Sequence, residues 1–392
     1  MLLDHFEHCL EPGPNGLLDV RALPTHGGVY LIVDRERRPV LLAHGENLRR
    51  VVVNRLAAPA PDQKSRRTNL SEIAGSVYWR GTFSRFETAL VHWRIVRLHD
   101  PRGYRESIGF GPSWFLRVRA EERLPRFTAV RELRDDGARY AGPFHSRRSA
   151  DAWVQMLEDI FDLCRYYDIL EQVPNGQPCA YYEMGKCPAP CDGSIPMSAY
   201  ADMIANAWAF TVGDREPGLS RLSALMQSAA GRLEFEKAAA LRQSIERAES
   251  LFKRPDNKYI GDVSTCRWLI IQRAGPARRT HEHTLIKPFV VHCGAIVEGE
   301  PISLAQADSV VPRWIEDYGE QPVPAVNTRD EQIARSELLW LVGKFLFQED
   351  RAPGLFLRFD RLPDVDELGA DIRRRFGSAS LPESDEAETQ PN

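Results

Sequence analysis

Apolar residues in the first hundred positions follow strand spacing at first and helical spacing later. Residues 29–34 and 40–43 are short apolar runs separated by a charged turn, which predicts a pair of strands. Asn47 is a favoured helix N-cap, and the spacing after it predicts a helix. Residues 85–98 also have helical spacing and stop shortly before Pro101, because the residue preceding a proline avoids helical geometry.

The rest of the chain continues this mixture of strands and helices. The segment at 218–252 has the pattern of a helical hairpin that turns near Gly231. Residues 1–20 contain turn-forming residues and predict irregular structure, and the acidic residues 378–392 predict disorder. The pattern indicates an α/β fold with several domains, with further strands at 114–118, 127–133, 267–273 and 285–297 and helices at 149–161, near 305–318 and at 328–347.

Charge divides the chain unevenly. Residues 1–150 contain 25 Lys and Arg against 17 Asp and Glu, and Lys64 is the single lysine among these cations. Guanidinium groups bind phosphates with two parallel hydrogen bonds, so this composition favours a nucleic-acid partner. The alternative is an arginine-rich genome with ordinary solvated surface charge.

The sequence gives no sign of a membrane partner. Asp4 and Glu7 interrupt the first ten residues, which is unlike a signal peptide. No apolar run approaches the roughly 18 residues that span a bilayer. We therefore expect a cytoplasmic protein.

Four of the seven cysteines fall within 28 residues, at Cys164, Cys179, Cys187 and Cys191. An odd total in a cytoplasmic chain argues against a disulfide framework. Four thiolates suit either zinc or an iron–sulfur cluster, and the spacing does not choose between them. The alternative is a set of buried free cysteines.

Four motifs occur in the order found in one known family. They are Gly28-Val29-Tyr30 with Asn47-Leu48-Arg49-Arg50, then Tyr140-Ala141-Gly142-Pro143-Phe144, the cysteine segment 178–193, and the helical segment 233–242. Together they resemble the UvrC family of excinuclease subunits along residues 26 to about 252. The resemblance implies a GIY-YIG nuclease-like domain at 26–145, a helix with a Cys-rich metal module at 146–200 and a UVR helical hairpin at 215–254. Outside it, the sequence predicts an N-terminal extension at 1–25, a C-terminal α/β domain of unknown role at 258–377 and a disordered acidic tail at 378–392. Residues 258–375 are too short for the C-terminal nuclease that the family has after its UVR hairpin.

The resemblance also implies a function and a set of binding residues. A UvrC-like protein acts in nucleotide excision repair, binds DNA and docks on a UvrB-like helicase subunit through its UVR hairpin. The docking residues would be Leu233, Phe235, Ala238, Leu241 and Ile245. The DNA-binding residues would be Arg49, Arg50, Arg55, Arg66 and Arg67. The metal ligands would be the four clustered cysteines.

The departures from the family fall on its nuclease chemistry. The resemblance places Leu41 where the family has its second signature tyrosine, His44 at a usual lysine, Val51 at the catalytic arginine and His92 at the metal-binding glutamate. Mg²⁺ prefers oxygen ligands, so His92 is a poor substitute. We expect Tyr30, His44 and His92 to converge on one shallow cleft, with Arg55 near the phosphate.

These departures predict a nuclease-like domain that binds DNA without cutting it, and Mg²⁺ is expected only if the site is active. Two alternatives remain. One is an active, divergent endonuclease that uses Tyr30, His44, Arg55 and His92 with a different metal. The other is a protein-interaction adaptor, since UVR hairpins beside Cys-rich modules also occur in regulators of protease systems.

Overall fold

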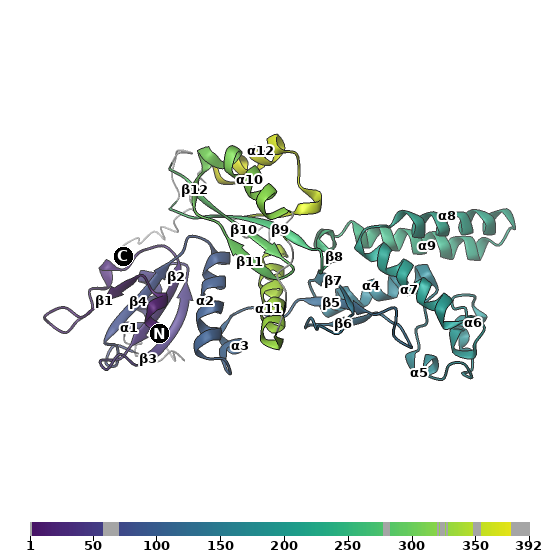
Figure 1. Ribbon diagram of the computed structural model, residues 1–392, viewed down its shortest axis with the longest axis horizontal. Coiled ribbons are helices and arrows are strands. Elements are labelled where there is room, and N and C mark those ends of the chain that lie inside the picture. The colour runs from purple at the N-terminus through teal and green to yellow at the C-terminus, as the bar shows by residue number, and fades with distance from the viewer. Residues whose placement is uncertain are drawn as a thin grey trace, which may run out of the picture.

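The computed structural model describes residues 2–57, 70–276, 283–319, 321, 326, 328–347 and 354–377. Arg66, Arg67 and the tail at 378–392 lie outside these residues. These described residues form an α/β fold with three sheets, arranged in sequence order except that the C-terminal part lies between the other two (Figure 1).

The N-terminal unit is an antiparallel sheet with a helix on each face. Its strand order is β1-β4-β2-β3, with β1 at His8–Leu10, β2 at Gly28–Val33, β3 at Pro39–Gly45 and β4 at Ser76–Gly81. Helix α1, Leu48–Leu56, packs on one face, and α2, Arg85–His99, packs on the other. The side chain of Asn47 accepts a hydrogen bond from the backbone of Arg50, which confirms the predicted N-cap.

Two strands of this sheet differ from the sequence prediction. Residues 8–10 form β1 rather than irregular structure and pair with β4. A three-residue strand is too short to show an alternating pattern, so the sequence offers no signal for it. Strand β4 was likewise not predicted.

The middle unit has the strand order β6-β5-β7-β8, with β5 at Trp114–Val118, β6 at Thr128–Val130, β7 at Arg139–Phe144 and β8 at Gly261–Asp262. Helix α3, Tyr104–Ser107, precedes it. Helix α4, Arg147–Phe161, packs on the sheet, and α7, Met197–Val212, packs on α4. The short helix α5, Tyr167–Leu170, precedes the cysteine segment, and α6, Ala180–Glu183, lies within it. The predicted strand at 127–133 is thus shorter than expected.

The predicted hairpin is present as α8, Glu216–Gly231, and α9, Phe235–Phe252. Its base joins the core of the middle unit through Leu222, Ala248 and Leu251, and the rest projects away from the molecule (Figure 1). After the hairpin the chain returns to the middle sheet, because β8 pairs with β7. Residues 261–262 therefore extend the middle sheet.

The C-terminal unit is a sheet with the order β11-β10-β9-β13, and β12 pairs with β10. These strands are β9, Arg267–Arg273; β10, Leu285–His292; β11, Ala295–Glu298; β12, Ile302–Ser303; and β13, Leu355–Arg358. Helices α10, Ala307–Gly319, and α12, Val365–Gly377, cover one face. Helix α11, Arg329–Leu346, covers the other and packs against α2 (Figure 1).

The predicted strand at 285–297 is two strands joined by a tight turn. Cys293 and Gly294 form the turn, with φ values of 49° and 89°. Two successive residues with positive φ are typical of a two-residue hairpin turn. Because β-branched residues occur on both sides of the turn, the sequence pattern predicted one continuous strand.

Candidate functional site

Two histidines lie against each other between the N-terminal sheet and α2. The ring centroids of His44, on β3, and His92, on α2, are 4.6 Å apart at an interplanar angle of 63°. His92 is 1% exposed, and neither of its ring nitrogens has a hydrogen-bond partner within the described residues. Burial, followed by the effect of His44, lowers the pKa of His92 to about 3. The His92 ring is therefore neutral at neutral pH.

Tyr30 does not join the two histidines. It packs with Leu48 and Val52 of α1, and it is 2% exposed. His44 is paired with Val29, whose side chain packs against α2, and successive side chains of a strand point to opposite faces. Tyr30 and His92 therefore lie on opposite faces of the sheet.

The prediction of one cleft formed by Tyr30, His44 and His92 is thus wrong. The physical reason is the register of β2 and β3, which places Tyr30 opposite Ala43 rather than His44. Arg55 belongs to α1, the helix on the Tyr30 face, so it is also separated from the histidines. The positions to which the resemblance assigns catalysis therefore do not form a single site.

The helix that contains His92 offers no free carboxylate. Glu87 is the single acidic residue of α2, and its Oε1 lies 2.8 Å from Nζ of Lys287. Lys287 also forms an ion pair with Glu298 at 2.6 Å. Glu87 is therefore held against the C-terminal unit by its own ion pair.

A pocket of about 290 Å³ opens beside His44. It is formed by the end of β3, the first turn of α2 and the second half of α11, and the residues around it are His44, Gly45, Glu46, Arg85, Thr88, Ala89, Lys344 and Phe345. Lys344 belongs to the C-terminal unit. Sequence reasoning missed it because no local pattern indicates that α11 packs beside β3.

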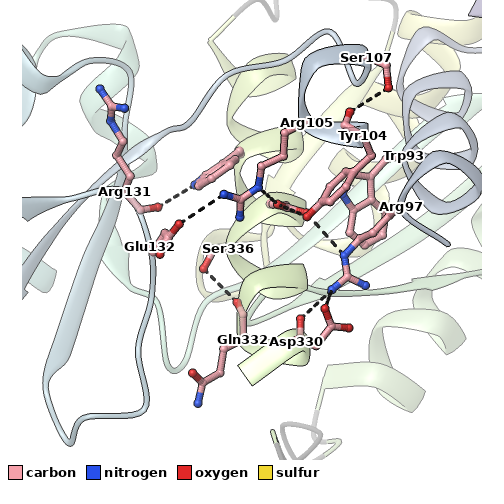
Figure 2. Close-up of polar contacts among 12 residues, drawn as sticks. Trp93, Arg97, Tyr104, Arg105, Ser107, Arg131, Glu132, Asp330, Gln332 and Ser336 are labelled. Carbon is pink, nitrogen blue, oxygen red and sulfur yellow. Dashed lines mark hydrogen bonds and ion pairs between the residues drawn. The ribbon is translucent and has the colours of Figure 1, made fainter. Parts of the chain in front are cut away.

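The contact of α11 with α2 and α3 is centred on a buried carboxylate, and Figure 2 labels Trp93, Tyr104 and Arg105, which bind it. Glu337 of α11 is fully buried and accepts hydrogen bonds from Trp93 Nε1 at 3.0 Å, Tyr104 Oη at 2.7 Å and Arg105 Nε at 2.8 Å. Nearer the surface, Arg97 forms an ion pair with Asp330 at 2.6 Å. These bonds fix α11 to α2 and α3.

The arginines predicted to bind DNA differ in their surroundings. Arg49 is partly buried, and its Nε donates a 2.8 Å hydrogen bond to the carbonyl oxygen of Leu23. Arg50 is exposed on the same helix, and Arg55 is half-buried at its end. Arg50 is therefore the clearest candidate for a phosphate contact on α1.

The structure brings three of the four clustered cysteines together. The Sγ of Cys164 donates a 3.3 Å hydrogen bond to the backbone oxygen of Tyr166, and its proximity to Cys187 lowers the pKa of Cys187 and raises the pKa of Cys164. Burial, and then the charge on Cys187, raises the pKa of Cys191. Cys179 is half-buried at the start of α6. Within the described residues, no group of three or more His, Cys, Asp or Glu side chains has the arrangement of a metal site.

The UVR-like hairpin exposes apolar residues at its tip. Leu233 is 71% exposed and Phe235 is 66% exposed. Leu241 and Ile245 are half-buried and pack against the core of the middle unit. The predicted docking residues thus divide into an exposed pair at the tip and a pair that contributes to the fold, with Ala238 half-buried between them.

Comparison with known families assigns the central part of the chain. Residues 113–210 match the middle domain of the UvrC/Cho excinucleases, and residues 219–251 match the UvrB/UvrC motif. This part of the chain is similar to the UvrC family. No described helix is long and apolar enough to cross a membrane.

Individual UvrC relatives extend the similarity beyond these two matches. The chain is 31% identical over 228 residues to the UvrABC system protein C of Trichlorobacter lovleyi and 29% identical over 235 residues to that of Moorella thermoacetica. These alignments cover 58% and 59% of this chain but 37% of each relative. The chain thus spans little more than a third of these UvrC proteins, and no solved structure matches it.

Proposed function

We propose that the protein acts in nucleotide excision repair as a cytoplasmic, DNA-binding component that docks on a UvrB-like helicase subunit and has no robust incision activity of its own. The exposed tip of the UvrB/UvrC motif carries this proposal. Leu233 and Phe235 project from a hairpin whose base is anchored by Leu222 and Leu251. An exposed apolar pair on a projecting element is typical of a docking surface.

The inferred lack of robust incision rests on the separation of Tyr30 from His92 by the sheet and on the absence of a free carboxylate on α2. Mg²⁺ requires oxygen ligands, whereas His92 is a buried neutral imidazole and Glu87 is paired with Lys287. DNA binding needs mainly cations, which the N-terminal residues supply in excess. We therefore infer binding of the DNA backbone without cleavage, with Arg50 as one phosphate contact.

The test uses the purified full chain and damaged duplex DNA, with and without a UvrB-type partner, in several divalent metals. We expect binding that weakens steeply with salt and no nicking. Arg50→Ala should weaken binding similarly for all sequences and reduce the salt dependence, whereas Arg374→Ala on α12 should not. Metal-dependent nicking that Tyr30→Phe abolishes would show an active, divergent endonuclease instead.

We also propose that Cys164, Cys187 and Cys191, with Cys179 as the fourth ligand, hold zinc or an iron–sulfur cluster. Three thiols are already neighbours, and thiolates are the ligands that both centres prefer. Gly176 supports a closely folded loop, because a Cβ there would lie 3.0 Å from the carbonyl oxygen of Cys191. The loop is thus compact enough to surround one centre.

Metal analysis and absorption spectroscopy after anaerobic purification test this centre. We expect zinc, or iron with sulfide, in the unmodified protein and its loss in Cys187→Ser. Cys9→Ser is the matched control, because Cys9 is exposed on β1 and remote in sequence from the segment. A fully folded, metal-free protein after this treatment would contradict the proposal.

A further inference from the structure

The pocket beside His44 combines positive charge from two units of the fold. Arg85 comes from the first turn of α2, and Lys344 comes from α11 of the C-terminal unit. Glu46 is the single carboxylate among the residues around the pocket, and it is already bonded to Arg85 Nε at 2.6 Å. The pocket therefore contains more positive than negative charge.

Lys344 is the cation of the pocket that has no ion pair with a described carboxylate. Its Nζ donates to the backbone oxygen of Gly109 at 3.1 Å, and no ion pair found within the described residues includes it. Burial, and then repulsion by Arg85, lowers the pKa of Lys344 below its usual value. A half-buried ammonium next to a second cation is stabilised when an anion enters.

The histidine pair forms the wall behind this cation. His44 lines the pocket, and the ring of His92 lies against it, one turn after Thr88 on the same helix. Both nitrogens of the buried His92 ring are without a partner within the described residues. Desolvation, and then the ammonium of Lys344, lowers the pKa of His44, which is an exposed residue of β3. His92 thus supports the pocket from behind, and His44 is the imidazole that faces the space.

We propose that this pocket binds a phosphate group, with Lys344 as its principal ligand and Arg85 and His44 completing the site. Phosphate oxygens accept hydrogen bonds only, which suits an ammonium, a guanidinium and an imidazole N–H. A volume of about 290 Å³ accommodates a phosphate group with water. A divalent metal does not fit, because two cationic side chains and one paired carboxylate surround the space.

This inference rests on the proposed function, because in DNA repair the phosphate would belong to a nucleic acid. A terminal phosphate suits a pocket better than an internal phosphodiester, because a strand end can enter where a continuous backbone must pass across. The C-terminal unit, which lies outside the two family matches, would thereby contribute to nucleic-acid binding through Lys344.

Calorimetry on the full chain measures the affinity for three ligands: inorganic phosphate, a 5′-phosphorylated oligonucleotide and the same oligonucleotide without the phosphate. We expect phosphate to bind and the phosphorylated strand to bind more tightly than the unphosphorylated one. Lys344→Gln should weaken phosphate binding about tenfold or more, as loss of a charged hydrogen bond does. Arg85→Gln should also weaken it, and Lys253→Gln, at the exposed end of α9, should not.

A second readout separates ligand contact from a folding defect. Added phosphate should shift the imidazole NMR signals of His44 in the unmodified protein and not in Lys344→Gln, while both proteins keep the same circular dichroism spectrum. Unchanged phosphate affinity in Lys344→Gln, or no phosphate binding by the unmodified protein, overturns the site but leaves Arg50-dependent DNA binding standing. Phosphate binding without any DNA binding supports the pocket and contradicts the proposed function.

Discussion

His92 shows how one residue can tie stability to pH. Its ring is almost fully buried on α2 and touches His44, and neither nitrogen is hydrogen-bonded within the described residues. A protonated ring in this place would be a buried charge without a counter-ion. The folded state therefore keeps His92 neutral, whereas the unfolded chain binds a proton there near the usual imidazole pKa.

We predict that the protein loses stability as the pH falls below about 6.5 because of this residue. The pKa of His92 is lowered from 6.5 to about 3, so the unfolded state takes up the proton first. Linkage gives a free energy of unfolding about 2 kcal/mol lower at pH 5 than at pH 7. Denaturant unfolding across this range should show the decrease, and His92→Phe should remove it. A decrease that persists in His92→Phe but disappears in the surface variant His8→Gln would contradict this assignment.

Single residues also show which features the sequence could predict and which it could not. The N-cap at Asn47 follows from local chemistry, and the structure confirms it. The separation of Tyr30 from His92 depends on which residue of β3 lies opposite Tyr30. That register is set by the turn between the strands and by an irregularity between Ile32 and Val33, and neither can be inferred from a pattern of apolar residues.

At the scale of elements, the α8–α9 hairpin has two regions with different roles. Leu222 at the base is 2% exposed in the core of the middle unit, whereas Phe235 at the tip is 66% exposed. The sequence predicted both helices and their turn, because helical periodicity depends on local spacing. The sequence did not predict that the base is buried and the tip exposed, since both regions have the same apolar pattern.

We predict opposite effects of truncating these two regions. Leu222→Ala should lower the free energy of unfolding by roughly 2–5 kcal/mol, because it leaves a cavity in a packed core. Phe235→Ala should change stability little and weaken binding to a UvrB-type partner. Thermal unfolding and a calorimetric titration with the partner measure the two effects. Equal partner affinity in Phe235→Ala and the unmodified protein would show that the partner does not bind at the tip.

At the scale of the whole molecule, α11 joins the C-terminal unit to the N-terminal one. Most of its residues from Ser336 to Leu346 are buried, because α2 lies on one side and the β9–β13 sheet on the other. A helix that is apolar nearly all round is expected to be buried in this way. The sequence predicted the helix at 328–347, but apolar residues do not specify which surface they will contact.

We predict that Glu337 is the strongest polar link between these units. Glu337→Ala would leave Arg105 and Trp93 without their buried partner, and we expect a loss of roughly 3–5 kcal/mol. Asp330→Asn is the matched control, because its pair with Arg97 involves a carboxylate whose side chain is 79% exposed, and it should cost less than about 1 kcal/mol. Denaturant unfolding compares the two variants. Equal effects would mean that the buried carboxylate adds nothing beyond a surface ion pair.

The contact between α2 and α11 can form only late in synthesis on the ribosome. Trp93 and Glu337 are 244 residues apart in sequence, so the apolar face of α2 emerges long before its partner exists. At typical bacterial elongation rates, synthesis of the residues between them takes roughly ten to fifty seconds. Phe86 and Leu90 belong to the core shared with the C-terminal unit, so they lack those packing partners during this interval. A chain shortened before α11 would keep that surface uncovered, and we expect it to be retained by chaperones or to aggregate during expression.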